Sequence, residues 1–136
     1  MSGRPDPRAA LVSVPRALFG SSVVILAVAA VVHSRGPLGS GELEVVSWMA
    51  VAWAGVAPIL ATLVRGQGLV APPPGPGETN AALVVRLQKT IVFFGVLESA
   101  VVLAAAALVV SAPFWPLAAA LLPLGVMALN LPPRSE

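Results

Sequence analysis

The chain has 136 residues, of which 57% are hydrophobic and 10% are charged, and its mean hydropathy is +0.92. An ordinary globular domain is roughly 25% charged, so this composition excludes a soluble domain and indicates an integral membrane protein in a lipid bilayer. The net charge of +2 does not indicate nucleic-acid binding, because the 8 lysine and arginine residues stand singly beside apolar segments. Cysteine is absent, which excludes disulfides and thiolate chemistry.

Four apolar segments predict an all-α membrane protein with four transmembrane helices in an up-down bundle, forming a single integral-membrane domain. The first covers about 16–33, after a tail of residues 1–15, and Pro15 suits a helix start because its missing N–H is harmless there. A secretory signal peptide is the competing interpretation, since arginines precede this segment and a small-x-small triplet occurs at 27–29. The second segment covers about 45–64, close to the ~20 residues that a spanning helix requires.

A linker rich in proline and glycine, residues 66–80, separates the second segment from the third. Prolines lack N–H donors, so this linker is expected to be extended and semi-rigid. Thr79 or Asn80 can cap a third helix, because either side chain can accept from an unpaired N–H in the first turn. The apolar part of that helix covers about 83–110, and a short fourth segment covers about 115–131.

The basic residues predict how these segments cross the membrane. Seven of the eight lie beside the N-terminus, the linker or the C-terminus, and only Arg35 lies beside the other two connections. By the positive-inside rule, this asymmetry places both termini and the linker in the cytoplasm. Trp48 and Trp115 then lie at the outer interface, where amphipathic aromatic rings are favoured. The seven residues are Arg4, Arg8, Arg16, Arg65, Arg86, Lys89 and Arg134.

Glu98 is the one acidic residue inside an apolar segment. Nine helical steps of ~1.5 Å from Lys89 place it about 13 Å into a hydrocarbon core of ~30 Å, near the midplane. An ionisable side chain at that depth is costly and marks a functional site by default. No basic residue lies in the core of any segment, so desolvation favours the neutral acid, and Glu98 is expected to donate a hydrogen bond.

The residues around Glu98 predict its contacts. Gly95 and Ser99 form a small-xxx-small pair on the same helix face, which allows another helix to approach closely. In the antiparallel second segment, Pro58 cannot donate to the carbonyl of Ala54, so that oxygen is left free at a similar depth. The sequence therefore predicts that Glu98 donates to the Ala54 carbonyl, with Ser99 assisting.

The third segment, from Leu87 through Glu98 to Ala100, resembles the second helix of the rotary ATP synthase c subunit. In that family a mid-membrane carboxylate is the reversible proton or sodium site, and the resemblance implies this role for Glu98. The chain departs from the family because the second segment contains only Gly55 where the family has closely spaced glycines, and because the polar loop is replaced by a long linker. The last two segments also resemble small uncharacterised four-span bacterial membrane proteins, which implies no activity.

Two functions remain open. With one histidine, no cysteine and isolated acids, the chain has no nucleophile–base pair, metal cluster or phosphate loop, so neither an enzyme nor a cofactor is expected. The first function is a structural or interaction protein, within a homo-oligomer or larger membrane complex, in which Glu98 fixes helix packing. The alternative is a proton- or sodium-handling subunit similar to subunit c. His33 is expected to be a solvated interface residue and Trp53 a packing residue. Hydroxyl groups expected to bond backbone carbonyls or neighbouring helices are those of Ser21, Ser22, Ser47 and Thr62.

Overall fold

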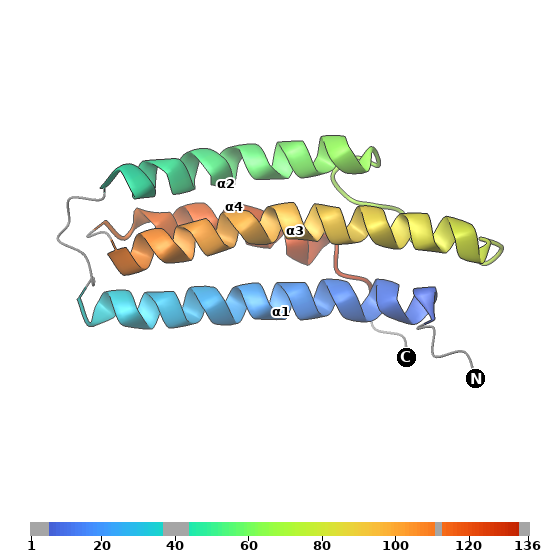
Figure 1. The fold of residues 1–136 in the computed structure, drawn as a ribbon, viewed down its shortest axis with the longest axis horizontal. Coiled ribbons are helices and arrows are strands. Elements are labelled where there is room, and N and C mark those ends of the chain that lie inside the picture. The colour runs from blue at the N-terminus through green and yellow to red at the C-terminus, as the bar shows by residue number, and fades with distance from the viewer. Residues whose placement is uncertain (1–5, 37–43, 111–112, 134–136) are drawn as a thin grey trace.

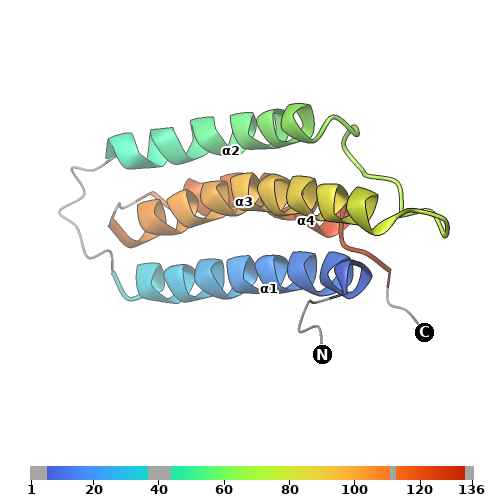
Figure 2. The ribbon, with the colours of Figure 1, turned by 45° about the vertical axis from the view of Figure 1, so that its right-hand side comes forward.

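The structure is a computed structural model that describes residues 6–36, 44–110 and 113–133. Figures 1 and 2 show a bundle in which helices that follow one another in the chain run in opposite directions. The start of the first helix, the end of the fourth and the linker lie together at what we call the linker end; the opposite end is the far end. The predicted up-down bundle is confirmed. The four helices are α1 (Pro7–Ser34), α2 (Glu44–Arg65), α3 (Asn80–Val110) and α4 (Trp115–Leu129).

Helix α3 lies at the centre of the bundle and contacts each of the other three helices. Helices α1 and α2 flank it, α4 packs behind it, and within the described ranges α1 and α2 do not contact each other (Figures 1 and 2). In the apolar 18-residue stretch of α3, 50% of the residues are buried inside the bundle, whereas in the corresponding stretch of α1 only 17% are buried. Its buried side chains include Phe93, Phe94 and Leu97, which pack in one apolar cluster, and Ala104 and Leu108, which pack in a second cluster nearer the far end.

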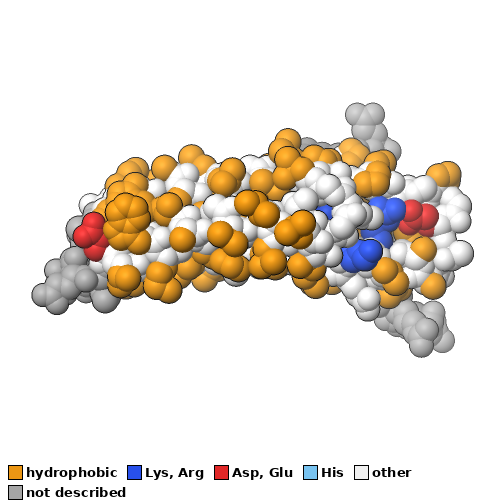
Figure 3. All heavy atoms as spheres, turned by 90° about the horizontal axis from the view of Figure 1, so that it is seen from above, with side chains coloured by type: hydrophobic (Ala, Val, Ile, Leu, Met, Phe, Trp, Pro, Cys, Tyr) orange, Lys and Arg blue, Asp and Glu red, His pale blue; other side chains and the backbone are white. Residues whose placement is uncertain are grey.

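Three helices, α1, α2 and α3, are long and apolar enough to cross a membrane. At ~1.5 Å per residue, the 22 residues of α2 cover about 33 Å, which matches a hydrocarbon core of ~30 Å. Figure 3 shows apolar side chains along the middle of the face seen from α2, and basic side chains gathered at the linker end. This distribution is that of a membrane protein.

Helix α4 is shorter than the predicted segment 115–131. Its 15 residues cover about 22 Å, less than the thickness of the hydrocarbon core. The helix ends just before Asn130, whose side-chain Nδ2 donates to the carbonyls of Leu69 at 2.9 Å and Val126 at 2.8 Å. Pro132 and Pro133 follow after Leu131 and cannot continue a helix. Helix α4 therefore packs behind α3 without the length of a full span.

Helix α1 begins earlier than the sequence predicted. The Asp6 carboxylate accepts from the Arg8 N–H at 3.1 Å, and Pro7 fills the first helical position, where a missing N–H costs nothing. Pro15 is buried inside the helix and does not mark its start. Residues 7–15, which were predicted to be tail, therefore form the first turns of α1.

Capped termini define the two ends of the linker. Helix α2 ends at Arg65 because Gly66 adopts a φ of +71°, which glycine tolerates best, and its N–H donates to the Thr62 carbonyl at 3.0 Å. Helix α3 begins where the Thr79 hydroxyl accepts from the Ala82 N–H at 3.2 Å. Of the two predicted caps, Thr79 is the one that the structure uses.

Helix α2 presents a row of alanines to α3 and α4. Ala50, Ala54, Ala57 and Ala61 recur every three or four residues and are at most 2% exposed. Because alanine has no atoms beyond Cβ, the helix backbones can approach closely, which favours packing where no hydrophobic effect operates between lipid and protein. This row forms a close helix contact, whereas the sequence predicted such a contact at Gly95 and Ser99 of α3.

Aromatic side chains close the far end of the bundle. The rings of Trp48 and Trp115 have centroids 5.0 Å apart, so the two tryptophans predicted for one interface do lie at the same end. The Nδ1 atom of His33 lies 2.8 Å from the Leu108 carbonyl, and this nitrogen donates because a carbonyl oxygen can only accept. His33 is half-buried and joins α1 to α3, whereas the sequence predicted a solvated residue.

Candidate functional site

Glu98 lies half-buried on α3, at the seam between α3 and α1. Its Oε1 atom is 2.9 Å from the hydroxyl oxygen of Ser21, which is near the middle of α1. The same hydroxyl is 2.9 Å from the carbonyl oxygen of Leu18, one turn earlier on α1. The carboxyl group therefore connects two parallel helices near the middle of their shared length.

The structure gives Glu98 a different partner from the predicted one. Within the described part of the chain, no hydrogen bond joins its carboxyl group to Ala54. Ala54 and Pro58 are both buried on α2, but Glu98 contacts α1, and α1 and α2 lie on different sides of α3. Consecutive helical residues point about 100° apart, so Glu98 contacts α1 while Ser99 contacts α2.

Ser99 makes the polar contact to α2. The indole Nε1 of Trp53 donates to the Ser99 hydroxyl at 2.9 Å, and that hydroxyl donates to the Val96 carbonyl at 2.6 Å. The prediction treated Trp53 as packing alone; the signal for its role was the indole N–H, which needs an acceptor inside a membrane. Ser99 thus has a polar role, but as the acceptor for an α2 side chain.

Gly95 does not mediate the predicted helix contact. It is exposed, and a Cβ built on it would meet nothing within 4 Å. Ser99 is exposed as well, so the pair lies on the outer face of α3. The buried alanine row of α2 performs the close approach that Gly95 and Ser99 were expected to allow.

The other hydroxyl groups show mixed outcomes. Thr62 donates to the Pro58 carbonyl at 2.7 Å, as expected of a hydroxyl in a membrane helix. The Ser22 hydroxyl is fully buried and has no hydrogen-bond partner among the described residues. A buried hydroxyl left unpaired costs about 1–3 kcal/mol, so Ser22 contributes no favourable polar contact to the α1 interface.

An apolar groove of about 530 Å³ begins one helical turn beyond the Glu98 contact, toward the far end. Its walls come from α1 and α3, and every lining residue is apolar; Val24 and Val102 stand nearest to Ser21 and Glu98 on their helices. Both valines are exposed, so the groove opens on the outside of the bundle. The carboxyl group is therefore close to the lipid-facing surface and not at the centre of the fold.

A second polar cluster, at the linker end, is built around Arg65. This side chain is only 2% exposed, and its guanidinium carbon lies 3.6 Å from the centroid of the Phe93 ring. Its Nη1 donates to the Asn130 side-chain oxygen at 2.8 Å, and its Nη2 donates to the carbonyls of Gly68 and Leu69 at 2.8 and 2.9 Å. These contacts join α2, α3, the linker and the residue that follows α4.

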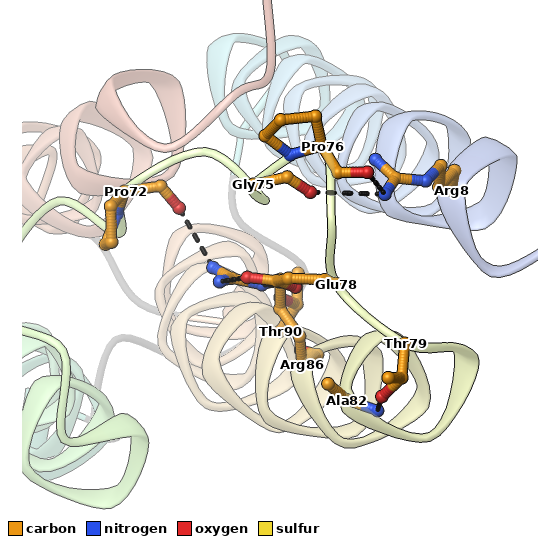
Figure 4. A network of polar contacts seen from close by, with 9 residues as sticks. All are labelled: Arg8, Pro72, Gly75, Pro76, Glu78, Thr79, Ala82, Arg86 and Thr90. Carbon is orange, nitrogen blue, oxygen red and sulfur yellow. Dashed lines mark hydrogen bonds and ion pairs between the residues drawn. The ribbon is translucent and has the colours of Figure 1, made fainter.

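Two further arginines hold the linker against the bundle (Figure 4). Arg8 of α1 donates from Nη2 to the carbonyls of Gly75 and Pro76, at 3.1 and 3.4 Å. Arg86 of α3 donates from Nη1 to the Pro72 carbonyl at 2.9 Å. The linker was expected to be semi-rigid because of its prolines, and these contacts additionally dock it onto two helices.

Arg86 also forms an ion pair with Glu78 at the end of the linker. Both its Nε and its Nη2 donate to the carboxylate, one to each oxygen. These hydrogen bonds hold the pKa of the Glu78 carboxyl below its ordinary value. Glu78 is therefore ionised near neutral pH and neutralises Arg86.

The residues that the structure describes contain no group of three or more histidine, aspartate or glutamate side chains that could hold a metal ion. Comparison of the chain with protein-family models, with curated proteins and with solved structures finds no match. The Glu98 contact and the arginine cluster at the linker end are thus the features of the molecule from which a function can be inferred.

Proposed function

We propose that the chain is a small multi-pass membrane protein of structural or interaction type, in which Glu98 is a neutral acid that fixes α3 against α1. The contact of 2.9 Å between Glu98 Oε1 and the Ser21 hydroxyl carries the proposal. In the described ranges no arginine or lysine pairs with Glu98. A lone carboxylate in hydrocarbon is costly, whereas a protonated carboxyl with a hydrogen-bond partner is tolerated.

A protonated Glu98 gives every group at this contact a partner without placing a charge there. A serine hydroxyl carries one hydrogen, and a carbonyl oxygen can only accept. With Ser21 donating to the Leu18 carbonyl across 2.9 Å, the protonated Glu98 donates to the Ser21 oxygen. Two hydrogen bonds in series then run from α3 to the backbone of α1 and leave no charge in the membrane.

We expect Ser21→Ala and Glu98→Leu each to lower the free energy of unfolding by about 1 kcal/mol, because each removes this hydrogen bond. Glu98→Gln should stay within about 0.5 kcal/mol of the wild type, since an amide also donates. Equilibrium unfolding in detergent micelles measures these differences. Ser34→Ala is the matched control, because among the described residues the Ser34 hydroxyl bonds only within α1, to the Val31 carbonyl. Strictly additive losses in the Ser21→Ala/Glu98→Leu double variant would refute the direct contact.

A second function, a proton- or sodium-handling subunit similar to subunit c, is favoured by one observation. Glu98 is half-buried at a seam that opens toward lipid, where a carboxyl group can exchange an ion within an oligomer. Glu98→Gln separates the two functions, because an amide keeps the hydrogen bond but cannot ionise. Ion flux into liposomes that is lost in this variant, with unchanged stability, supports ion handling; flux equal to the wild type eliminates it.

We infer that the linker end faces the cytoplasm, in the inner membrane of a bacterium. Among the described basic residues, Arg35 lies at the far end and the others lie at the linker end, which supports this orientation by the positive-inside rule. Arg4 and Arg134 lie outside the described residues. Because the chain has no cysteine, Gly77→Cys and Arg35→Cys supply single labelling sites. An impermeant thiol reagent applied to intact cells should label position 35 alone, and labelling of position 77 alone would invert the orientation. The described basic residues at the linker end are Arg8, Arg16, Arg65, Arg86 and Lys89.

A further inference from the structure

A pocket of about 420 Å³ lies at the linker end, between the start of α1, the linker and the residues that follow α4. Arg8, Arg65 and Arg86 line it, each from a different helix, and no acidic residue is among its lining. Most of the other walls are apolar, and include Pro73 and Leu131. The pocket thus combines positive charge with apolar walls at the end of the membrane-spanning part of the bundle.

The described residues do not balance the charges of this pocket. Among the described residues, the ion pair between Arg86 and Glu78 neutralises one of the three arginines. Arg8 and Arg65 donate to carbonyl and amide oxygens, which carry no formal charge. Asp6 accepts from the backbone N–H of Arg8 and not from its guanidinium. Two positive charges therefore remain for an anionic ligand.

The arginines also keep donors that the fold does not use. Arg8 has hydrogen bonds from Nη2, while its Nε and Nη1 have no partner among the described residues. The Nε of Arg65 is buried and has no hydrogen-bond partner in the described part of the chain. Both bidentate edges of a guanidinium group include Nη2, which Arg8 already uses, so Arg8 can offer a phosphate group single charge-assisted donors from Nε and Nη1 while Arg65 contributes a fixed charge.

We propose that this pocket binds a phosphate-bearing anion, either the headgroup of an anionic phospholipid or a free phosphate group. The arginines supply the charge and the unused N–H donors, and Figure 4 shows Arg8 and Arg86 meeting the linker from two helices. The apolar walls favour a ligand with an attached hydrocarbon part, as a lipid has. This site is independent of Glu98 and of the proposed role of that residue.

The test uses the full chain in nanodiscs of phosphatidylcholine to which phosphatidylglycerol is added. Native mass spectrometry and the thermal midpoint report binding. We expect the wild type to retain phosphatidylglycerol selectively, and Arg8→Gln to weaken this binding on the order of tenfold, as the loss of a charge-assisted hydrogen bond predicts. Arg8→Lys, which keeps the charge but not the guanidinium donors, should recover part of the binding.

A parallel titration with inorganic phosphate distinguishes the two sources. Stabilisation by phosphate alone assigns the site to a free phosphate group, and selective retention of phosphatidylglycerol without competition by phosphate assigns it to a lipid headgroup. Lys89→Gln is the control for general surface charge, because Lys89 lies at the linker end outside this pocket. Stability measured without phosphatidylglycerol or phosphate separates a folding defect in Arg8→Gln from lost binding. No response to either probe, or an equal loss in Lys89→Gln and Arg8→Gln, overturns the proposal.

Discussion

Arg65→Ala is expected to lower the free energy of unfolding by about 3 kcal/mol, because it removes the buried guanidinium group that joins α2, the linker and the residue after α4. The substitution leaves the carbonyls of Gly68 and Leu69 without their guanidinium donor and removes the cation from the face of Phe93. It also removes the hydrogen bond to the side-chain oxygen of Asn130, the residue that follows α4. The end of α2, the linker and the end of α4 then lose their shared contact.

Equilibrium unfolding in detergent micelles measures this loss for Arg65→Ala beside two comparison variants. Arg65→Lys should fall between the wild type and Arg65→Ala, since an ammonium keeps the charge but cannot replace the planar fork of donors. Arg35→Ala removes an exposed arginine at the far end and should change stability by less than about 0.5 kcal/mol. If Arg65→Ala is as stable as Arg35→Ala, the network does not hold the linker end together.

Ala57→Leu is expected to cost about 1–3 kcal/mol, because it overpacks the contact of α2 with α3 and α4. Ala57 is 0% exposed, so the three added carbons meet packed neighbours and push the helices apart. The residue before it, Val56, is 50% exposed and points outward. Val56→Leu therefore adds bulk to the same helix without entering the bundle.

The two variants are compared by equilibrium unfolding and by the efficiency of a crosslink between α2 and α3. Ala57→Leu should lower both, while Val56→Leu should stay within about 0.5 kcal/mol of the wild type. Equal behaviour of the two variants would contradict the alanine face as the close helix contact. A loss in Val56→Leu alone would indicate that the outer face of α2 meets a partner in the membrane.

The class of the protein and the order of its elements could be predicted from the amino-acid sequence. The described bounds of α2 lie one residue from the predicted ones at each end, and α3 ends at Val110 as predicted. These features follow from local chemistry, since apolar runs partition into lipid while glycine, proline and charged residues end them. The predicted start of α1 at Pro15 is wrong, because Asp6 and Pro7 form the start signal that the structure uses.

The tertiary structure decided which faces of the helices meet. In α3 nearly every position is apolar, so no periodicity distinguishes the side that faces lipid from the side that faces protein. The contact of Glu98 with Ser21, the contact of Ser99 with Trp53 and the burial of Arg65 all depend on how each helix is rotated and placed. Packing sets that rotation, because lipid solvates all apolar faces of a membrane helix about equally well.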